Sequence, residues 1–461
     1  MELKFPKTFK FATATAAYQI EGGIELDGRG RSTWDEIREQ PGRIADNSNV
    51  DLSCEGRLKF RDDVKLLKEI GVTTYRFSIS WSRILPNGDI SIVNQDAITY
   101  YRELCQHLID ANIEPIITLF HADMPLKTFD SGSWLNWKNC QDFVELSDLC
   151  FKSFGDLVKT WITFNEINMQ AWCGLVKFEG QPWHSPNRPD PENKEKVPYL
   201  AASNMLLAHA EIYHRYKNLY KESQNGKIGI VNGGRFGFPA SDSEEDLEAR
   251  NRALDWLFNY TIEPIFGNGW PKRMEKMKLT EFTKEQQEKI RGSADFLGIN
   301  YYVSHKVKNL DKVENAPSQC EADGQFDFAE DDFERICGDT WVKYVPEGLY
   351  ELLKYVKQKY GDIPIWITEN GCMDIEGDPL EDNHRVRYIQ GHLEAVSKAI
   401  ASGINVIGYT VWSLMDNFEW DDGFAVRFGI CRIDFENDPE KKRILKKSAK
   451  FYSEFIRKAL S

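Results

Sequence analysis

The stretch Ile363-Pro364-Ile365-Trp366-Ile367-Thr368-Glu369-Asn370-Gly371 is an apolar run that ends in a carboxylate close to a glycine. The apolar residues predict a short buried strand, and the glycine predicts the loop that follows it. A carboxylate at such a junction is held by rigid backbone and is open to a cleft. Taken alone, Glu369 is explained equally well as a functional residue and as a solvated loop residue or a partner in a structural ion pair.

A second β-rich run, Trp161-Ile162-Thr163-Phe164-Asn165-Glu166, also ends in a glutamate. Because about two hundred residues separate Glu166 from Glu369, the two face each other only in a fold that gathers strand ends in a ring or a row. Paired carboxylates in such a place are what glycoside hydrolysis requires. The pair therefore favours a catalytic interpretation of both residues.

Short β-rich runs alternate with longer helical patterns along the chain. The strand candidates are 9–15, 73–80, 114–120, 160–165, 227–232, 295–300, 363–368 and 406–412, and the helix candidates are 58–70, 95–111, 140–154, 199–221, 347–360 and 383–401. This alternation predicts parallel βαβ units. Eight units favour a closed (β/α)₈ TIM barrel, an α/β fold, over an open doubly wound sheet. The active site of such a barrel lies at the C-terminal ends of its strands.

The chain has 461 residues, whereas a typical barrel of this kind has about 250. We expect the excess in loops such as 172–198 and 302–346, the second of which is polar, acidic and without clear periodicity. Long loops at the catalytic face shape the mouth of a pocket. Because neither a linker nor an internal repeat is visible, residues 1–461 are predicted to form one domain.

Charge and cysteine usage narrow the partners and the compartment. The chain has 58 Lys and Arg against 72 Asp and Glu, a net charge of −14, which disfavours nucleic acid, anionic membranes and polyanionic substrates unless a local basic pocket exists. No run approaches the length of a membrane span, and no apolar signal segment is visible. The nine cysteines are scattered without zinc spacing, so we expect reduced thiols, no metal site and a cytoplasmic protein.

The two carboxylates divide the chemistry of glycoside cleavage between them. A protonated carboxylic acid protonates the departing oxygen, and a carboxylate meets the developing oxocarbenium ion. We assign Glu166 as the acid/base and Glu369 as the nucleophile, with carboxyl groups about 5–5.5 Å apart if the mechanism is retaining. Arg76, midway along its strand candidate, is the cation expected to keep Glu369 ionised. The partly apolar pocket around Glu166 and the negative charge beside it should raise the pKa of Glu166.

Sugar binding needs hydrogen-bonding groups for the hydroxyls and an aromatic platform for the apolar face of the ring. Singly, each candidate is more often a core or loop residue, but together they gather at predicted strand ends. The polar candidates are Gln19, His121, Asn165 and Glu419, and the aromatic candidates are Trp412 and Trp420.

Nearly the whole chain resembles glycoside hydrolase family 1, the β-glucosidase family. The motifs that carry the resemblance are 11–22, Tyr75-Arg76-Phe77-Ser78-Ile79-Ser80-Trp81-Ser82-Arg83, Thr163-Phe164-Asn165-Glu166, Asn300-Tyr301-Tyr302, 367–371 and 412–420. The resemblance implies a barrel that hydrolyses β-glycosides with retention and needs no cofactor, with Glu166 and Glu369 in the roles assigned above.

The resemblance also implies how the other site residues act. Asn300 and Tyr302 would support the carboxylates, with the Tyr302 hydroxyl donating to Glu369. The non-reducing sugar would be held by Gln19, His121, Asn165, Glu419 and Trp420, with Trp412 beneath it.

Two positions depart from the family pattern. Ile167 stands where members usually have proline after the acid/base glutamate, and we expect a small effect on loop stiffness. Ala122 stands where members commonly have an aromatic residue after the histidine. The loss of that ring removes one wall of the sugar subsite, which either admits a substituted sugar or weakens glucoside binding.

Several alternatives stay open within this fold. One is a klotho-like sugar-binding barrel without chemistry, which the presence of both glutamates disfavours. Another is a glycosidase specialised for a modified sugar. The carboxylate of Glu419 disfavours phosphorylated sugars, so unphosphorylated gluco-, galacto- or fucosides are preferred. Glucosinolate hydrolysis is disfavoured because plant-type versions replace the acid/base glutamate. The sequence specifies neither the aglycone nor the oligomeric state of this small-molecule β-glycosidase.

Overall fold

A closed ring of parallel strands forms the centre of the protein. The computed structural model describes residues 3–48, 50–51, 53–173, 194–277, 281–377 and 379–461. Its barrel strands follow the order β5-β4-β3-β2-β1-β9-β8-β6, and pairing of β6 with β5 closes the ring. These strands are β1 Lys10–Ala14, β2 Thr74–Ser78, β3 Glu114–Phe120, β4 Thr160–Phe164, β5 Lys227–Pro239, β6 Phe296–Asn309, β8 Ile365–Asn370 and β9 Val406–Trp412. The predicted (β/α)₈ barrel is confirmed.

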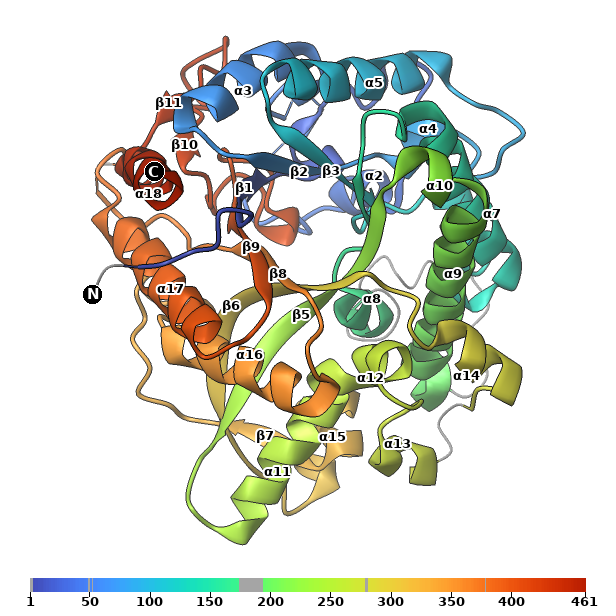
Figure 1. Ribbon diagram of the computed structural model, residues 1–461, viewed down its shortest axis with the longest axis vertical. Coiled ribbons are helices and arrows are strands. Elements are labelled where there is room, and N and C mark those ends of the chain that lie inside the picture. The colour runs from blue at the N-terminus through green and yellow to red at the C-terminus, as the bar shows by residue number, and fades with distance from the viewer. Residues whose placement is uncertain (1–2, 49, 52, 174–193, 278–280, 378) are drawn as a thin grey trace.

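Helices surround the strands (Figure 1). The longer ones are α3 Gly56–Ile70, α5 Gln95–Asp110, α7 Trp137–Phe154, α9 Val197–Leu219, α11 Glu244–Leu254, α16 Pro346–Tyr360, α17 Asn383–Ala401 and α18 Lys447–Leu460. The shorter ones are α1 Ala17–Ile20, α2 Thr33–Arg38, α4 Trp81–Ile84, α6 Leu126–Asp130, α8 Ile167–Cys173, α10 Lys221–Gln224, α12 Tyr260–Phe266, α13 Lys272–Met277, α14 Lys284–Ile290 and α15 Gln319–Gly324. Each predicted helix is present, whereas α11 and α18 were not predicted.

Local sequence signals explain where several helices begin and end. The side chain of Asn94 accepts from the backbone N–H groups of Asp96 and Ala97, so it caps the first turn of α5. Gly71 ends α3 in a left-handed conformation with φ 83°, which costs glycine little. These ends place the following strands β2 and β3 at their starting points in the ring.

The floor of the barrel is apolar. Ile116, Ile162, Val231, Phe296 and Trp366 come from different strands and form one buried cluster. A Cβ added at Gly408 would lie 2.5 Å from the ring of Trp366, so the absence of a side chain there makes room for the indole. This packed floor leaves the opposite, polar end of the barrel for the site.

The segment expected to be an irregular loop, 302–346, is partly regular. Strand β6 continues to Asn309 and pairs with the antiparallel strand β7 Phe326–Ala329, and α15 precedes β7. The prediction failed because this extension is stabilised by pairing between strands distant in sequence, which leaves little local periodicity. Of the other predicted loop, 172–198, residues 174–193 lie outside the described residues. The small antiparallel pair β10 Cys431–Arg432 and β11 Ile444–Leu445 lies near the C-terminus.

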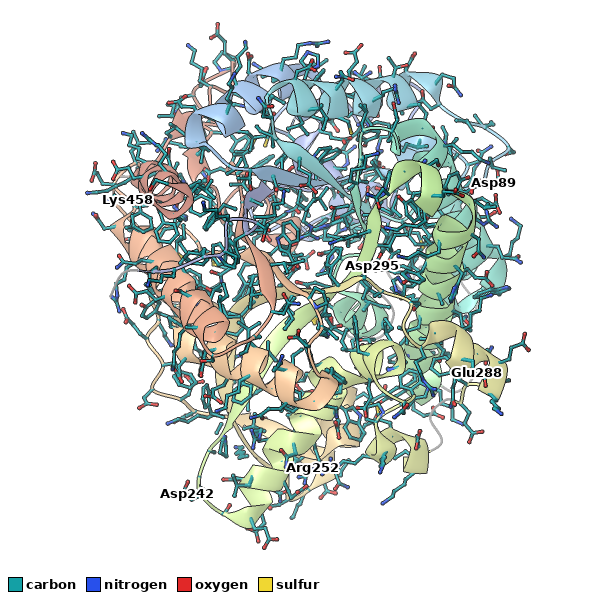
Figure 2. The ribbon with its side chains drawn as sticks, in the orientation of Figure 1. Asp89, Asp242, Arg252, Glu288, Asp295 and Lys458 are labelled. Carbon is teal, nitrogen blue, oxygen red and sulfur yellow. The ribbon has the colours of Figure 1, made fainter. Side chains whose placement is uncertain are left out.

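Charged side chains lie on the outside of the molecule. Figure 2 shows Asp89, Asp242, Glu288 and Lys458 at its periphery. The cysteines whose side chains are described are buried and unpaired. In the described part of the chain, no helix is both long and apolar enough to cross a membrane.

Candidate active site

The residues that the sequence predicts for the site come together at the C-terminal end of the barrel. They are Gln19 in α1 after β1, Arg76 in β2, His121 after β3, Asn165 and Glu166 after β4, Asn300 and Tyr302 in β6, Glu369 in β8, Trp412 at the end of β9, and Glu419 and Trp420 in the segment that follows. Contacts link them into a network at Glu369 and Glu166 and a sugar-sized group of rings and polar atoms beside it.

A register irregularity in β8 turns Glu369 into the barrel. The register with β6 shifts between Ile299 and Asn300, so that Thr368 is an extra residue in β8. As a result, both Thr368 and Glu369 face inward: the Thr368 hydroxyl donates to Asn300 Oδ1 over 2.7 Å, and Glu369 pairs with Arg76. Bulges commonly re-aim a side chain beside an active site.

Glu369 is held by two donors. Arg76 Nη1 donates to Glu369 Oε1 over 2.7 Å, and the Tyr302 hydroxyl donates to Oε2 over 2.8 Å. Arg76 is itself fixed by donation to the Thr368 carbonyl oxygen and the Thr118 hydroxyl. One carboxylate oxygen therefore faces a buried cation and the other a phenol, which orients the carboxyl group rigidly.

Glu166 is joined to the same network through two asparagines. Asn300 Nδ2 donates to Glu166 Oε1 over 2.9 Å and to Asn165 Oδ1 over 3.0 Å, and Arg76 Nη2 donates to Asn165 Oδ1 over 2.6 Å. Glu166 has φ 47°, a left-handed conformation uncommon for residues other than glycine. Ile167, fully buried, follows it as the first residue of α8. Burial of this side chain anchors the turn that aims Glu166.

The two glutamates have different electrostatic surroundings. Burial and the charge of Glu369 raise the pKa of Glu166 to about 7, against the hydrogen bond from Asn300. Burial also raises the pKa of Glu369, but Arg76 and the Tyr302 hydroxyl oppose that rise. Glu166 is therefore the group suited to hold a proton at neutral pH, and Glu369 is the group next to a cation.

The sugar-sized group lies beside this network. His121 stacks on Trp412 with ring centroids 5.8 Å apart and on Trp420 at 6.1 Å. Gln19 Nε2 donates to Glu419 Oε2 over 3.2 Å. Burial, followed by the charge of Glu369, raises the pKa of Glu419 to about 8.

Two buried polar atoms in this group have no hydrogen-bond partner among the described residues. They are Gln19 Oε1 and His121 Nδ1. Burial lowers the pKa of His121 well below its usual range, so its ring is neutral. Buried polar atoms usually find partners, so these two are available to hydroxyl groups of a bound sugar.

Sequence reasoning missed several residues of the site. Thr118 and Thr368 fix Arg76 and Asn300, and the only signal for them was their position inside predicted strands. Trp341 is 47% exposed and its ring lies 5.4 Å from that of Tyr302. It belongs to the segment 302–346, whose course the sequence did not reveal.

A buried cluster of charges ties together the loops that follow β8 and β9. Lys446, fully buried, contacts Asp374 Oδ2 over 2.9 Å and Asp416 Oδ1 over 2.8 Å. Arg385 pairs with Asp374 and Asp382. Because Asp374 follows β8 and Asp416 precedes Glu419, this cluster fixes the two loops relative to each other.

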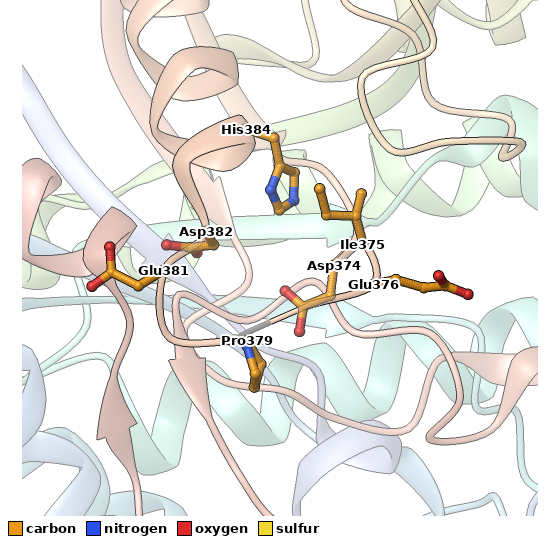
Figure 3. A pocket seen from close by; sticks show the side chains of 7 residues that line it. All are labelled: Asp374, Ile375, Glu376, Pro379, Glu381, Asp382 and His384. Atoms are coloured by element: carbon orange, nitrogen blue, oxygen red, sulfur yellow. The ribbon is translucent and has the colours of Figure 1, made fainter.

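A small acid-lined pocket of about 100 Å³ lies behind this cluster (Figure 3). Two of its carboxylates, Asp374 and Asp382, are already paired with Arg385. In the part of the chain that the structure describes, no group of three or more His, Cys, Asp or Glu side chains could hold a metal ion. None of the residues that line the pocket is among those that the sequence predicts for the active site.

A parallel eight-stranded barrel with two differently tuned glutamates at the C-terminal ends of its strands is the arrangement of an O-glycoside hydrolase. The model of the family described as "Glycosyl hydrolase family 1" matches residues 1–460. The chain belongs to this family and is a retaining β-glucosidase-type enzyme that acts on small glycosides, not a barrel that has lost its chemistry.

The relatives of this chain agree with that assignment. It is 40% identical, over 98% of its length and 82% of the relative's, to 4-hydroxy-7-methoxy-3-oxo-3,4-dihydro-2H-1,4-benzoxazin-2-yl glucoside β-D-glucosidase 1b, chloroplastic, of Triticum aestivum. A rice β-glucosidase mutant in a covalent complex with Glc superposes with a TM-score of 0.90 at 33% identity, covering 100% of this chain and 99% of the other. An aphid myrosinase superposes with a TM-score of 0.91 at 35% identity, covering 98% of this chain and 99% of the other.

The predicted cytoplasmic location is wrong by this comparison. Wheat relatives 39–40% identical to this chain are named chloroplastic and not cytoplasmic. Free thiols indicate a compartment in which disulfides do not persist, and this property does not single out the cytosol.

Proposed function

We propose that Glu369 is the nucleophile and Glu166 the acid/base of a double displacement on terminal non-reducing β-D-glucosyl residues. Glu369 attacks the anomeric carbon while Glu166 protonates the departing oxygen, which leaves a covalent glycosyl-enzyme. Loss of the Glu369 charge on glycosylation lowers the pKa of Glu166, so Glu166 then accepts a proton from the attacking water. The observation that carries this proposal is the hydrogen-bonded network from Glu369 through Arg76, Asn165 and Asn300 to Glu166.

The sugar is held by the group beside that network. Gln19 Oε1 and His121 Nδ1, which lack partners among the described residues, accept or donate to its hydroxyls. Glu419 adds a carboxyl group, and the rings of Trp412 and Trp420 provide the apolar faces. Asp422, whose charge contributes to the raised pKa of Glu419, disfavours a phosphate on the sugar at this end of the site.

Release of 4-nitrophenol from its β-glucoside, β-galactoside and β-fucoside tests the proposal. We expect the glucoside to be hydrolysed, with activity on the other two showing how far the pocket tolerates change at the sugar. Glu369→Gln should lower kcat by about 10⁴-fold or more because no covalent intermediate can form. A 2-fluoro glucoside should label Glu369 in the wild-type protein.

Glu381→Gln is the matched control, because Glu381 is exposed and pairs with Lys447 at the surface. It should retain wild-type turnover. Wild-type turnover by Glu369→Gln, or labelling at a different residue, would contradict the assignment. No turnover of any of the three substrates by folded wild-type protein, with no labelling, would refute the proposed function itself.

A further inference from the structure

Strand β5 runs past the barrel and along the cleft beside Glu166. A Cβ added at Gly233 would lie 3.4 Å from the carboxyl carbon of Glu166, so this glycine faces the carboxylate. A Cβ at Gly234 would instead meet Leu352 of α16 at 2.8 Å. The two faces of β5 are therefore distinct here: Gly233 faces Glu166 and Met169 of α8, and Gly234 faces Leu352 of the outer helix α16.

Arg235 lies on the cleft side of this strand. Burial alternates along it, with Gly233 and Arg235 partly exposed and Gly234 and Phe236 buried. Since alternate residues of a strand share a face, Arg235 has the same direction as Gly233. The register with β6 shifts at this point, but the extra residue, Tyr302, belongs to β6. The guanidinium is thus presented to the cleft next to Glu166.

Arg235 has no partner for its charge among the residues that the structure describes. In the part of the chain that the structure describes, it makes no ion pair, hydrogen bond or cation–π contact. In contrast, Arg76 and Arg83 are paired with the carboxylates of Glu369 and Glu21. The chain has a net charge of −14, yet this guanidinium beside Glu166 is not paired with any described carboxylate. It is therefore free to pair with an anionic group of a bound ligand.

The groups around Arg235 do not neutralise it. Its charge opposes the burial that raises the pKa of Glu166, and with burial and Lys343 it lowers the pKa of His305 to about 3. The acidic neighbour of His305 is Asp331, which is already paired with Lys343 over 2.6 Å. His305 is therefore neutral, and the nearby carboxylate is committed to another cation.

We propose that Arg235 binds a negatively charged group on the aglycone, so that this enzyme prefers β-glucosides with an anionic leaving group. The inference rests on the proposed function, because the leaving group lies on the side of the residue that protonates it, Glu166. A guanidinium fork matches the two oxygens of a carboxylate or a sulfo group. The charge belongs on the aglycone because Arg235 shares the strand face of Gly233, which lies against Glu166, the residue that protonates the departing aglycone.

Four aryl β-D-glucosides test this. The 3-carboxyphenyl and 3-sulfophenyl glucosides are anionic, and the 3-carbamoylphenyl and 3-sulfamoylphenyl glucosides are their neutral counterparts of similar size. For each pair, the readout is the ratio of kcat/KM for the anionic to the neutral substrate. We expect a ratio above one in the wild-type protein, set by KM and reduced by added salt. The larger of the two ratios identifies whether carboxylate or sulfo groups fit better.

Arg235→Gln should lower that ratio about tenfold, the scale of one charge-assisted hydrogen bond, and Arg235→Lys should restore part of it. The matched control is Arg250→Gln. Arg250 is on α11, where it lies over the ring of Phe236 at 5.8 Å, so this variant removes the same charge on the outer side of β5. Its ratio should equal that of wild type.

A second readout is the basic limb of the pH profile for a neutral substrate. Arg235→Gln should move it to higher pH, because the lost cation no longer opposes the raised pKa of Glu166, and Arg250→Gln should leave it in place. A wild-type ratio of one or below, or an equal ratio in wild type and Arg235→Gln, would overturn the inference while leaving glucosidase function intact. Failure of the wild-type protein on these glucosides and on 4-nitrophenyl β-glucoside would instead refute the proposed function.

Discussion

At the scale of single residues, the carboxyl group of Glu166 connects burial, charge and pH dependence. Burial and Glu369 raise its pKa to about 7, so its protonated form predominates below that pH and is lost above it. We therefore predict that kcat/KM for 4-nitrophenyl β-glucoside falls as pH rises through about 7. In Glu166→Gln, assayed with the more activated 2,4-dinitrophenyl glucoside, this decline should disappear. A decline that persists unchanged would assign the titration to another group.

Glu419 allows a prediction about stability. Its folded-state pKa of about 8 exceeds its ordinary value of 4.5, so between these values the folded state holds a proton that the unfolded state releases. The free energy of unfolding consequently falls as pH rises through this window. Glu419→Gln removes the effect, so its Tm should exceed that of wild type at pH 9 by more than at pH 4. Thermal scans at both pH values measure this. A Tm difference between Glu419→Gln and wild type that is the same at pH 4 and pH 9 would contradict the raised pKa of Glu419.

Ala122 is the residue at which sugar selectivity can be altered. It lies next to His121 with φ 67°, a backbone conformation whose cost is already incurred by alanine and is shared by any L-residue. Ala122→Trp or Ala122→Phe should therefore fold, add an aromatic wall and shift selectivity toward plain glucosides. The measurement is relative kcat/KM across a panel of glycosides, in which unchanged ratios would show that this position does not line the sugar subsite.

At the scale of elements, the loops after β8 and β9 depend on the start of α18. Lys446 bridges Asp374 and Asp416. Asp374 keeps Arg385 as a partner, but Lys446→Met leaves the buried carboxylate of Asp416 without its cation, a loss of about 3–5 kcal/mol. Because Asp416 lies shortly before Glu419, we also predict a larger rise in KM than fall in kcat. Denaturant unfolding and steady-state kinetics measure the two effects.

Lys447→Met is the control for that variant. Lys447 is the next residue, exposed and paired with Glu381, and such a surface pair contributes about 0–1 kcal/mol. Equal destabilisation by the two substitutions would show that the buried bridge has no special role. An unchanged KM in Lys446→Met would show that the Lys446 bridge does not position the segment that carries Glu419.

At the scale of the whole molecule, the two ends of the chain are interlocked. Strand β1 pairs with both β2 and β9, the Tyr452 hydroxyl of α18 donates to the Ala12 carbonyl, and Arg443 pairs with Asp63 of α3. We propose that residues 1–461 form one cooperative domain. Calorimetry should give a single transition with equal calorimetric and van't Hoff enthalpies, and two resolved transitions would overturn this.

Much of the architecture followed from sequence because its signals are local. Each barrel strand contains a short β-rich run, and residues such as Asn94 and Gly71 mark where helices begin and end. The extension of β6 and its pairing with β7 were missed because their stability comes from partners distant in sequence. The same holds for Trp341, whose place beside Tyr302 depends on the path of an entire loop.

The sequence by itself determined the alternation of strands and helices, and hence the barrel and the strand ends at which the glutamates stand. Only the tertiary structure decided which side chains share the cleft. The shifted register of β8 turns both Thr368 and Glu369 inward, and the course of β5 leaves Arg235 without a partner among the described residues. Registers, charges and burial of this kind depend on neighbouring strands, because only they supply the hydrogen bonds and counter-charges that set a side chain's direction and protonation.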